Sequence, residues 1–418
     1  MWLRNFYIIA IIAAFGIAGI NAAEPNINNV LSVNARVAGA KGDGITDDTV
    51  ALQKAFDDAC NNKMFGGKAP RTVIIPPGTY RITETLKLGD VHRNISITGT
   101  GGARNPKYAT TQIVYDGKPG NPLLECKPLA GLTMKNILLN GNNKAGVVMR
   151  INSTKAHGTA EFFIEAVNFY NADIGIECGV DLEACASDMT FIDIVIENMK
   201  TCGFKADSGQ ALDYVFIRPE VNNTPTGFHF IKGGAATFIH PCAYKVDTLL
   251  KVEKTGINSG VFSIRGWFWE RHAYSDPNKK MVFVDASGEA NVTVIGTATG
   301  CTRVWGEKAD LETPNFILGP SAQLTVIGCM ISGKIAKLKG AKDDVATFAQ
   351  FDNCRFRCAS DPAKDIDADD YSGYEFRNCN VTVDDTKGTD YKVFKRKFIP
   401  RLIKYPAQSE VQSAERKD

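Results

Sequence analysis

Apolar residues recur in a repeated pattern along most of this chain. Each copy alternates apolar residues with others, passes through one turn residue and ends in a second short apolar run. The ten copies are LTMKNILL (132–139), FFIEAVNF (162–169), MTFIDIVI (189–196), YVFIRPEV (214–221), ATFIHPCA (236–243), FSIRGWFW (262–269), VTVIGTAT (292–299), LTVIGCMI (324–331), AQFDNCRF (349–356) and YEFRNCNV (374–381). Alternation with a period of two indicates short β-strands with one buried face.

One turn residue stands at the same place in every copy. These residues are Asn136, Ala166, Asp193, Arg218, His240, Gly266, Gly296, Gly328, Asn353 and Asn378. Successive turn residues lie 22 to 32 residues apart, which suits one solenoid coil of three short strands and their turns. The pattern predicts an all-β fold, a single-stranded parallel β-helix of about ten coils that occupies residues 23–394.

Three consecutive turn positions, Asp193, Arg218 and His240, carry ionisable side chains. Polar side chains stacked at a tight corner account for them, and an active site is the alternative.

A second kind of apolar strand falls between these copies. Its members are AGVVM (145–149), IGIEC (174–178), CGFKA (202–206), TGFHF (226–230), TLLKV (248–252), KMVFV (280–284) and NFILG (315–319). Because the side-chain period is two, the first and third strand residues are expected to point inward and the middle one outward. The inward set is Val147, Met149, Ile176, Cys178, Phe204, Ala206, Phe228, Phe230, Leu250, Val252, Val282 and Val284. The outward column holds Glu177, Lys205, His229 and Lys251 on successive coils.

The N-terminal part has a helical pattern instead. Gly39, Gly42 and Gly44 supply turns before Thr46-Asp47-Asp48, whose side-chain oxygens and negative charge suit the start of a helix. A helix over about 47–61 follows, and its expected buried stripe is Val50, Ala51, Ala55, Phe56 and Ala59. Because one amphipathic helix is not stable alone, we expect it to cover the open end of the solenoid.

Three short motifs around this helix resemble the opening of a known family. They are A-K-G-D-G-I-T-D-D-T (40–49), P-P-G-T-Y (76–80) and I-T-G-T-G (97–101). In this order they resemble the start of the pectate-lyase superfamily, which includes rhamnogalacturonases, polygalacturonase-like hydrolases, epimerase-like proteins and phage tailspikes. The resemblance covers about a quarter of the chain and implies a right-handed parallel β-helix with an N-terminal capping helix.

The resemblance implies carbohydrate chemistry without fixing its type. The polygalacturonase branch carries N-T-D, D-D, G-H-G and R-I-K motifs on its coils; this set is absent, and Phe228-His229-Phe230 replaces G-H-G. A lyase acting on uronates needs instead a cation or Ca²⁺ to neutralise the substrate carboxylate, and a base to remove the neighbouring proton. The column Glu177, Lys205, His229 and Lys251 is the candidate catalytic site, and a solvated face of weakly paired charges is the alternative.

The segment 265–272, RGWFWERH, combines aromatic and charged side chains. Indole faces stack on sugar rings, and loops on a rigid scaffold often carry sites. The candidate substrate-binding residues are therefore Trp267, Trp269, Glu270, Arg271 and His272. The predicted register places both tryptophans in the core, which is the alternative; a slip of one residue would turn them outward.

Eleven cysteines leave at least one without a partner inside the chain. Cys329, Cys354 and Cys379 directly follow turn residues in consecutive coils and are expected to stack as an interior column of thiols. A disulfide between adjacent coils is the alternative in an oxidising compartment.

Both ends of the chain depart from the solenoid pattern. Arg4, an apolar run over 6–20 and small residues near Ala22 predict a signal peptide over residues 1–22, with a membrane anchor as the alternative. A secreted or periplasmic location follows. Residues 395–418 begin with Lys395-Arg396-Lys397, end in a polar run and predict a frayed tail.

The balance of charges and the spacing of the histidines bear on whether the chain binds nucleic acid, a membrane or a metal ion. The chain has 48 basic and 46 acidic residues, which gives no electrostatic footprint for nucleic acid or for a membrane after signal removal. The five histidines show no paired metal-ligand spacing, so no metal site or cofactor is predicted, although the acidic segment 361–370 is a candidate Ca²⁺ loop.

The leading hypothesis is a secreted carbohydrate-active protein that cleaves or remodels a polysaccharide containing uronic acid, as a lyase or a glycoside hydrolase. The alternative is a non-catalytic β-helix that binds glycans or serves as a surface or adhesion module.

Overall fold

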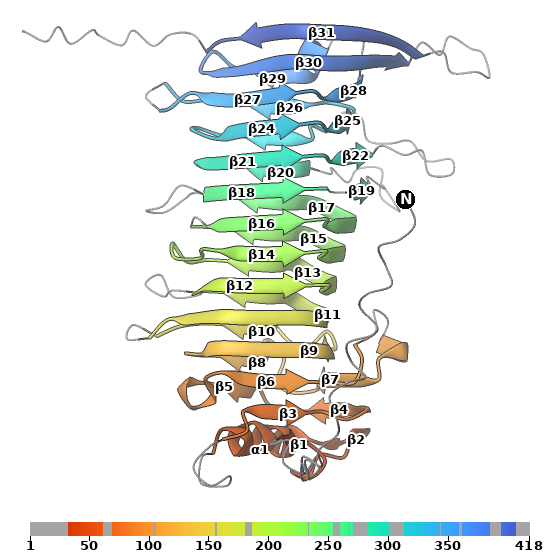
Figure 1. Cartoon of the computed structure of the whole chain (residues 1–418), viewed down its shortest axis with the longest axis vertical. Coiled ribbons are helices and arrows are strands. Elements are labelled where there is room, and N and C mark those ends of the chain that lie inside the picture. Colours follow the sequence, from red (N-terminus) through yellow and green to blue (C-terminus); the bar gives the residue numbers. More distant parts are fainter. Residues whose placement is uncertain are drawn as a thin grey trace, which may run out of the picture.

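The computed structural model describes residues 32–61, 69–102, 106–154, 157–179, 186–232, 234–253, 260–266, 268–270, 282–300, 313–342, 344–358, 362–384 and 394–406. These residues form one elongated stack of coils with a helix at its N-terminal end (Figure 1). The predicted β-helix with a capping helix is therefore confirmed.

Three columns of strands form three faces along the stack. The first face contains β1 (Val33–Asn34), β3 (Thr72–Ile74), β6 (Ile95–Thr98), β9 (Ala130–Asn140), β11 (Thr159–Cys178), β12 (Ala186–Ile192), β14 (Tyr214–Ile217), β16 (Ala235–Ile239), β18 (Gly260–Arg265), β21 (Ala290–Ile295), β24 (Gln323–Ile327), β27 (Thr347–Asp352) and β30 (Ser372–Asp384). The second face contains β2 (Asp43–Asp47), β4 (Gly78–Ile82), β7 (Thr111–Tyr115), β13 (Val195–Ala206), β15 (Glu220–Phe230), β17 (Cys242–Val252), β19 (Phe268–Glu270), β22 (Ala298–Gly300), β25 (Met330–Ser332) and β28 (Arg355–Cys358), together with later parts of β9, β11 and β30.

The third face carries the candidate site. It contains β5 (Leu86–Leu88), β8 (Pro122–Cys126), β10 (Val147–Ile151), β20 (Val282–Ala286), β23 (Phe316–Leu318), β26 (Ala336–Leu338) and β29 (Ile366–Ala368), together with the last parts of β11, β13, β15 and β17. Short 3₁₀ turns, η3 (Asp90–His92), η4 (Pro106–Tyr108) and η5 (Pro362–Asp365), lie in the connecting loops. Every pairing between coils is parallel, so side chains at equal register lie above one another about 4.8 Å apart.

The single-residue turns are confirmed at all ten predicted positions. Each of these residues has a φ between 47° and 65°, the left-handed region. Such a residue bends the chain by a fixed angle after each strand of the first face, and glycine and asparagine tolerate the conformation best. The ten repeats correspond to β9, β11, β12, β14, β16, β18, β21, β24, β27 and β30.

Gly328 offers a direct test of this turn. Its φ is +63° and a Cβ added there would meet nothing within 4 Å, so an alanine would be penalised by backbone conformation alone. We expect Gly328→Ala to lower the free energy of unfolding by about 1 kcal/mol, and Gly328→Asn to lower it by less because asparagine tolerates this region. Urea unfolding midpoints of the two variants would check this; equal midpoints would contradict it.

The inward residues predicted for the third face are buried, at 0–7% exposure. Gly175, Gly203 and Gly227 lie within β11, β13 and β15, and a Cβ at each would lie 2.5–2.7 Å from a carbonyl oxygen of the next coil. Glycine is needed there for close approach of two backbones, and not for a positive φ.

The thiol column is also present in the core. Cys329, Cys354 and Cys379 are buried and free, which fits the stacked arrangement and not the disulfide. Hydrogen bonds with the two neighbouring thiols, together with burial, raise the pKa of Cys354. Each sulfur also donates to a backbone carbonyl, such as Cys354 Sγ to Val326 O at 3.4 Å.

Helix α1 (Thr49–Cys60) covers the N-terminal end of the stack (Figure 1). Its buried residues are Thr49, Leu52, Ala55, Phe56 and Ala59. The prediction was wrong for Val50, which is 80% exposed, and it omitted Leu52. The Gln53 side-chain amide donates to Lys87 O and accepts from Lys87 N, both at 2.9 Å, as a neighbouring strand would. The helix therefore satisfies the edge of β5 with one side chain.

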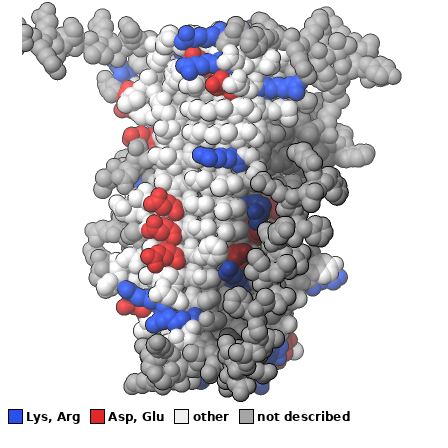
Figure 2. Space-filling view, in the orientation of Figure 1, with Lys and Arg blue, Asp and Glu red and all other residues white. Residues whose placement is uncertain are grey.

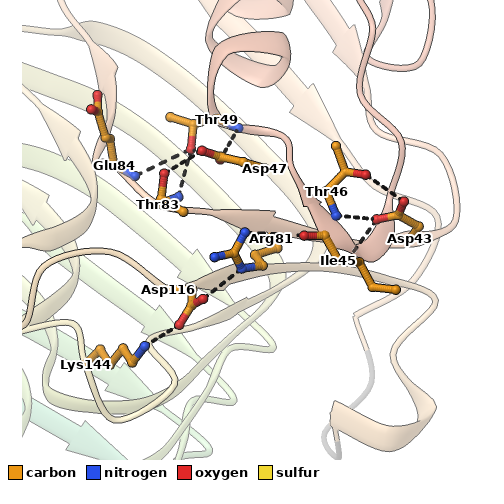
Figure 3. A network of polar contacts seen from close by, with 10 residues as sticks. All are labelled: Asp43, Ile45, Thr46, Asp47, Thr49, Arg81, Thr83, Glu84, Asp116 and Lys144. Carbon is orange, nitrogen blue, oxygen red and sulfur yellow. Dashed lines mark hydrogen bonds and ion pairs between the residues drawn. The ribbon is translucent and has the colours of Figure 1, made fainter.

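The D-G-I-T-D-D-T motif holds this cap together by three differently used carboxylates. Asp43 accepts from the backbone of Ile45 and Thr46, and these bonds lower the Asp43 pKa to about 2. Asp47 accepts from Thr49 N and from Thr83 Oγ1, which ties the helix start to the next coil (Figure 3). Asp48 is the N-cap residue, but its carboxylate binds the backbone of residues 41 and 42 instead of the helix.

A cluster of ion pairs lies next to the same motif and contacts it. Arg81 Nε lies 2.7 Å from Asp116 Oδ2, the other oxygen of Asp116 binds Lys144, and Arg81 also donates to Ile45 O (Figure 3). The motif is thus explained by folding contacts of the cap.

The C-terminal end is covered by an antiparallel strand. β31 (Phe394–Lys404) pairs along β30 from Tyr374↔Lys404 to Asp384↔Phe394. The predicted frayed tail is therefore wrong for residues 395–404, while residues 407–418 lie outside the described part of the chain. Arg401 Nε lies 2.9 Å from the buried carboxylate of Glu375, which anchors the strand on the last coil. A basic edge strand with Pro400 in it hinders further strand pairing.

Candidate functional site

A column of mainly ionisable residues runs along the outside of the third face. In register order it contains Lys87, Glu125, Arg150, Glu177, Lys205, His229, Lys251, Asp285, Ile317, Lys337 and Asp367. We call this column the outer ladder. The four predicted catalytic residues are confirmed as its neighbouring rungs, while their catalytic role stays a prediction.

The lower middle of the outer ladder is a buried ion-pair cluster. Glu177 is 5% exposed and its two carboxylate oxygens lie 3.0 Å from Arg150 Nε and 3.2 Å from Lys205 Nζ. A carboxylate with both oxygens paired in this way has its hydrogen-bonding capacity largely satisfied. Glu177 therefore orients Lys205 on the outer face and is itself poorly placed to touch a substrate.

The next rungs form a three-residue cluster around Glu253. Glu253 Oε1 lies 2.6 Å from Lys251 Nζ and 3.1 Å from His229 Nε2. The His229–Glu253 approach does not have the angle of a good hydrogen bond, so Nε2 is buried without a hydrogen-bond partner among the described residues. The hydrogen bond from Lys251 lowers the pKa of Glu253.

Burial controls the charge of His229. Its side chain is only 17% exposed, and desolvation lowers the pKa of the imidazole from its usual value of 6.5. The neighbouring cations Lys251 and Lys205 act in the same direction, against Glu253. His229 is therefore neutral at pH 7, as a general base must be before it takes a proton.

Asp285 occupies the rung after Lys251. Burial raises the pKa of its carboxyl, and its Oδ1 is buried without a hydrogen bond to any described residue. From strand spacing and rise, the Cα atoms of Asp285 and Glu253 lie on the order of 8 Å apart on diagonal positions. The two carboxyl groups thus have pKa values shifted in opposite directions, a pattern typical of an acid and a base pair.

Sequence reasoning missed Arg150, Glu253 and Asp285. The segments 145–149 and 280–284 were aligned two residues too early; the strands that pair in the ladder are β10 (Val147–Ile151) and β20 (Val282–Ala286). The inward parity was right because the slip was even. The signal that would have corrected the alignment is the charged residue directly after each apolar run, Arg150 after Met149 and Asp285 after Val284.

The predicted sugar platform is largely outside the described residues. This applies to Trp267, Arg271 and His272, and to the side chains of Trp269 and Glu270. The backbone of Trp269 pairs with that of Ala243 on the coil before it. Their role in substrate binding stays a prediction.

The polar corner at Asp193 is an ion pair. Arg218 donates to Asp193 from Nε at 2.6 Å and from Nη2 at 2.5 Å, so the two turn residues pair bidentately across adjacent coils. His240 lies on the next coil with Nδ1 3.2 Å from Gly266 O. This arrangement matches the expected polar ladder.

Metal ligands and membrane spans were sought in the described part of the chain. There, no three His, Cys, Asp or Glu side chains are grouped so that they could hold a metal ion, and residues 362–370 of the candidate Ca²⁺ loop are included. No described helix has the length and apolar character needed to cross a membrane.

The N-terminal part of the chain matches a known family. Residues 32–120 match the family "Rhamnogalacturonase A/epimerase, pectate lyase-like". A solved structure, the A-module of mannuronan C-5 epimerase AlgE6 from Azotobacter vinelandii, superposes over 84% of this chain and 93% of its own, with a TM-score of 0.52 and 16% identity. This chain has the pectate-lyase-like right-handed β-helix fold.

Other relatives of this β-helix protein differ in activity. A probable glucan endo-1,3-beta-glucosidase of Arthroderma benhamiae is 36% identical over 110 residues, which are 24% of this chain and 11% of the relative. Alginate lyase 7 of Azotobacter vinelandii is 40% identical over 75 residues, 17% of this chain and 8% of the relative. The N-terminal fragment of bacteriophage phi29 gene product 12 shares the fold over 83% of this chain and 66% of its own, with a TM-score of 0.52 and 13% identity. The matches span about a tenth of the curated relatives, at 11% and 8% of their lengths.

Proposed function

We propose that this β-helix protein is a secreted carbohydrate-active enzyme that acts on a uronic-acid-containing polysaccharide by removing the proton next to the uronate carboxylate. The observation that carries the proposal is a neutral histidine, His229, between two lysines in register, Lys205 and Lys251. The relatives named as a lyase and an epimerase support the chemical class. The apolar run within residues 1–22 supports secretion.

The geometry suggests a role for each side chain. Lys205 and Lys251 flank His229 at about 4.8 Å spacing along the ladder, so both can approach one carboxylate bound over His229. Neutralising that carboxylate stabilises the carbanion-like transition state. Because His229 Nε2 is buried, the other ring nitrogen, Nδ1, is the one a substrate can reach.

A lyase and an epimerase share the first step of this reaction, the removal of the C5 proton. The C5 proton passes to His229 Nδ1 and leaves an electron pair on C5, which the lysine-bound carboxylate delocalises. In a lyase this pair forms a C4–C5 double bond, the C4–O bond breaks and the leaving oxygen takes a proton. In an epimerase, a proton returns to the opposite side of C5 instead.

Digestion of a substrate panel tests the proposal. Pectin, alginate and rhamnogalacturonan would be incubated with the purified mature chain. Absorbance of unsaturated products near 235 nm reports elimination, and deuterium uptake from D₂O at C5 without chain cleavage reports epimerisation. Absence of both on every substrate, or glycan binding without turnover, would favour the non-catalytic module.

A glycoside hydrolase is a second candidate because of the Asp285 and Glu253 carboxyl pair. Burial raises the Asp285 pKa and suits an acid, while Lys251 lowers the Glu253 pKa and suits a base or nucleophile. New reducing ends without 235 nm absorbance, lost in Asp285→Asn, would support this candidate.

A further inference from the structure

A groove on the described surface lies between the cap helix and the start of the third face. Its volume is about 750 Å³, and it is bounded by α1 on one side and by β5, η3 and β8 on the other. A groove of this size is in the range of small-molecule and saccharide sites.

One carboxylate in this groove is held in place by its neighbours. Asp57 Oδ1 accepts from Gln53 Nε2 at 3.0 Å and lies 2.9 Å from His92 Nε2. His92 is 5% exposed, and its Nδ1 accepts from Gly89 N, so the ring donates from Nε2 to Asp57. Asp57 Oδ2 takes no hydrogen bond from a described residue, and the side chain is 57% exposed. Two buried or anchored donors thus fix one oxygen and leave the other open to the groove.

The groove also has exposed apolar side chains beside its polar ones. Val50 is 80% exposed and Val91 is 69% exposed, and both line it. Lys87 and Glu125 also line it, and they present a cation and a carboxylate at neighbouring positions of equal register. Apolar C–H surface next to acceptors and donors is the chemistry that a pyranose ring with its hydroxyl groups requires.

The groove is continuous with the outer ladder. Lys87 and Glu125 are its first two rungs, and Arg150 and Glu177 follow in register. Four coil steps separate Glu125 from His229, about 19 Å at 4.8 Å per coil. An extended saccharide centred on His229 and parallel to the stack would reach the groove.

We infer that the groove between α1 and β5 is a saccharide-binding site that holds the distal part of a long substrate chain, with Asp57 and Glu125 as hydroxyl acceptors. This inference rests on the proposed function for the direction of the chain, but binding in the groove does not require turnover. Val50 is exposed on α1 and lines the groove, so the inference gives this side chain a role in binding.

Isothermal titration of the full chain carrying His229→Gln tests binding without turnover. The probes are oligouronates and β-1,3-glucan oligosaccharides long enough to span four coils. We expect one probe class to bind, and Asp57→Asn or Glu125→Gln to weaken that binding about tenfold, because each removes a charged acceptor. Glu125→Gln leaves every α1 contact in place, and Asp188→Asn on β12 is the matched control, expected to bind as the parent does.

In the turnover assay, the groove variants should raise KM for long chains and leave kcat and the KM for disaccharides unchanged. Failure of both probe classes to bind the His229→Gln parent, or equal binding by that parent, Asp57→Asn and Glu125→Gln, would overturn the inference. Groove-dependent binding with no turnover by the wild-type chain would uphold the inference and reject the proposed function. Turnover of long chains with the same KM in the wild type and in the groove variants would uphold the proposed function and reject the inference.

Discussion

His229→Gln is expected to lower turnover of a uronate polymer by about 10²–10⁴-fold, because it removes the proposed general base. Glutamine keeps a polar group of similar reach in the partly buried position, so the thermal unfolding midpoint should stay within a few degrees. Initial rates at 235 nm with saturating substrate would measure the effect. Lys251→Ala should also lower the rate, since it removes one of the two cations that neutralise the substrate carboxylate.

Lys135→Ala provides the matched control for the lysine. Lys135 pairs with Glu165 on the first face, away from the outer ladder, so its loss should leave the rate unchanged. A His229→Gln enzyme with wild-type turnover would contradict the assignment of the base.

The pH profile follows from the direction of the His229 shift. Burial lowers the His229 pKa below 6.5, so the neutral base is the major form at pH 6.5 and the acidic limb of kcat/KM should have its midpoint below that value. The same shift affects stability: it contributes fully above pH 6.5 and its contribution is lost as the pH falls through the lowered pKa. An acidic limb centred above pH 6.5 would argue for another base.

Phe216→Ala is expected to lower the free energy of unfolding by about 3–5 kcal/mol. Phe216 is fully buried between Phe191 and Phe238, with ring centroids 4.8 and 5.0 Å away and planes within 8° of parallel. Phe204 and Phe228 pack edge-on against it, with centroids 5.1 and 5.0 Å away. Coils above and below hold these rings in place, so the core cannot close over the cavity. Urea unfolding followed by far-UV circular dichroism would measure the loss.

Phe163→Ala makes the same deletion on the outside of the first face. Its ring is partly exposed and carries Lys135 Nζ 4.9 Å from its centroid, so the expected loss is below about 1 kcal/mol. Equal losses in the two variants would show that the aromatic column does not stabilise the coils more than a surface ring does.

The coil architecture could be predicted from the sequence because its determinants are local. A left-handed turn residue restricts residue choice, as at Gly328 and Asn353, and the alternation of apolar residues fixes which side of each strand is buried. Parallel stacking then converts equal register into contact, so Lys205 and His229 could be placed on neighbouring rungs before any coordinates were known.

Contacts between residues that do not stand at equal register on neighbouring coils could not be predicted in this way. Glu253 lies outside the repeated segment, two residues after Lys251, and its carboxylate reaches both Lys251 on its own coil and His229 on the coil before. Val50 was assigned to the core because helical periodicity gives a stripe without its absolute orientation, which the packing of Leu52 and Phe56 decides.

The sequence by itself determined the repeating coil, its inward and outward columns and the capping helix, since these depend on the conformational and hydrophobic preferences of neighbouring residues. Only the tertiary structure decided that β31 closes the far end, that Asp285 extends the outer ladder and that α1 borders a groove. Each of these depends on which distant surfaces meet, and that is set by the summed geometry of many coils.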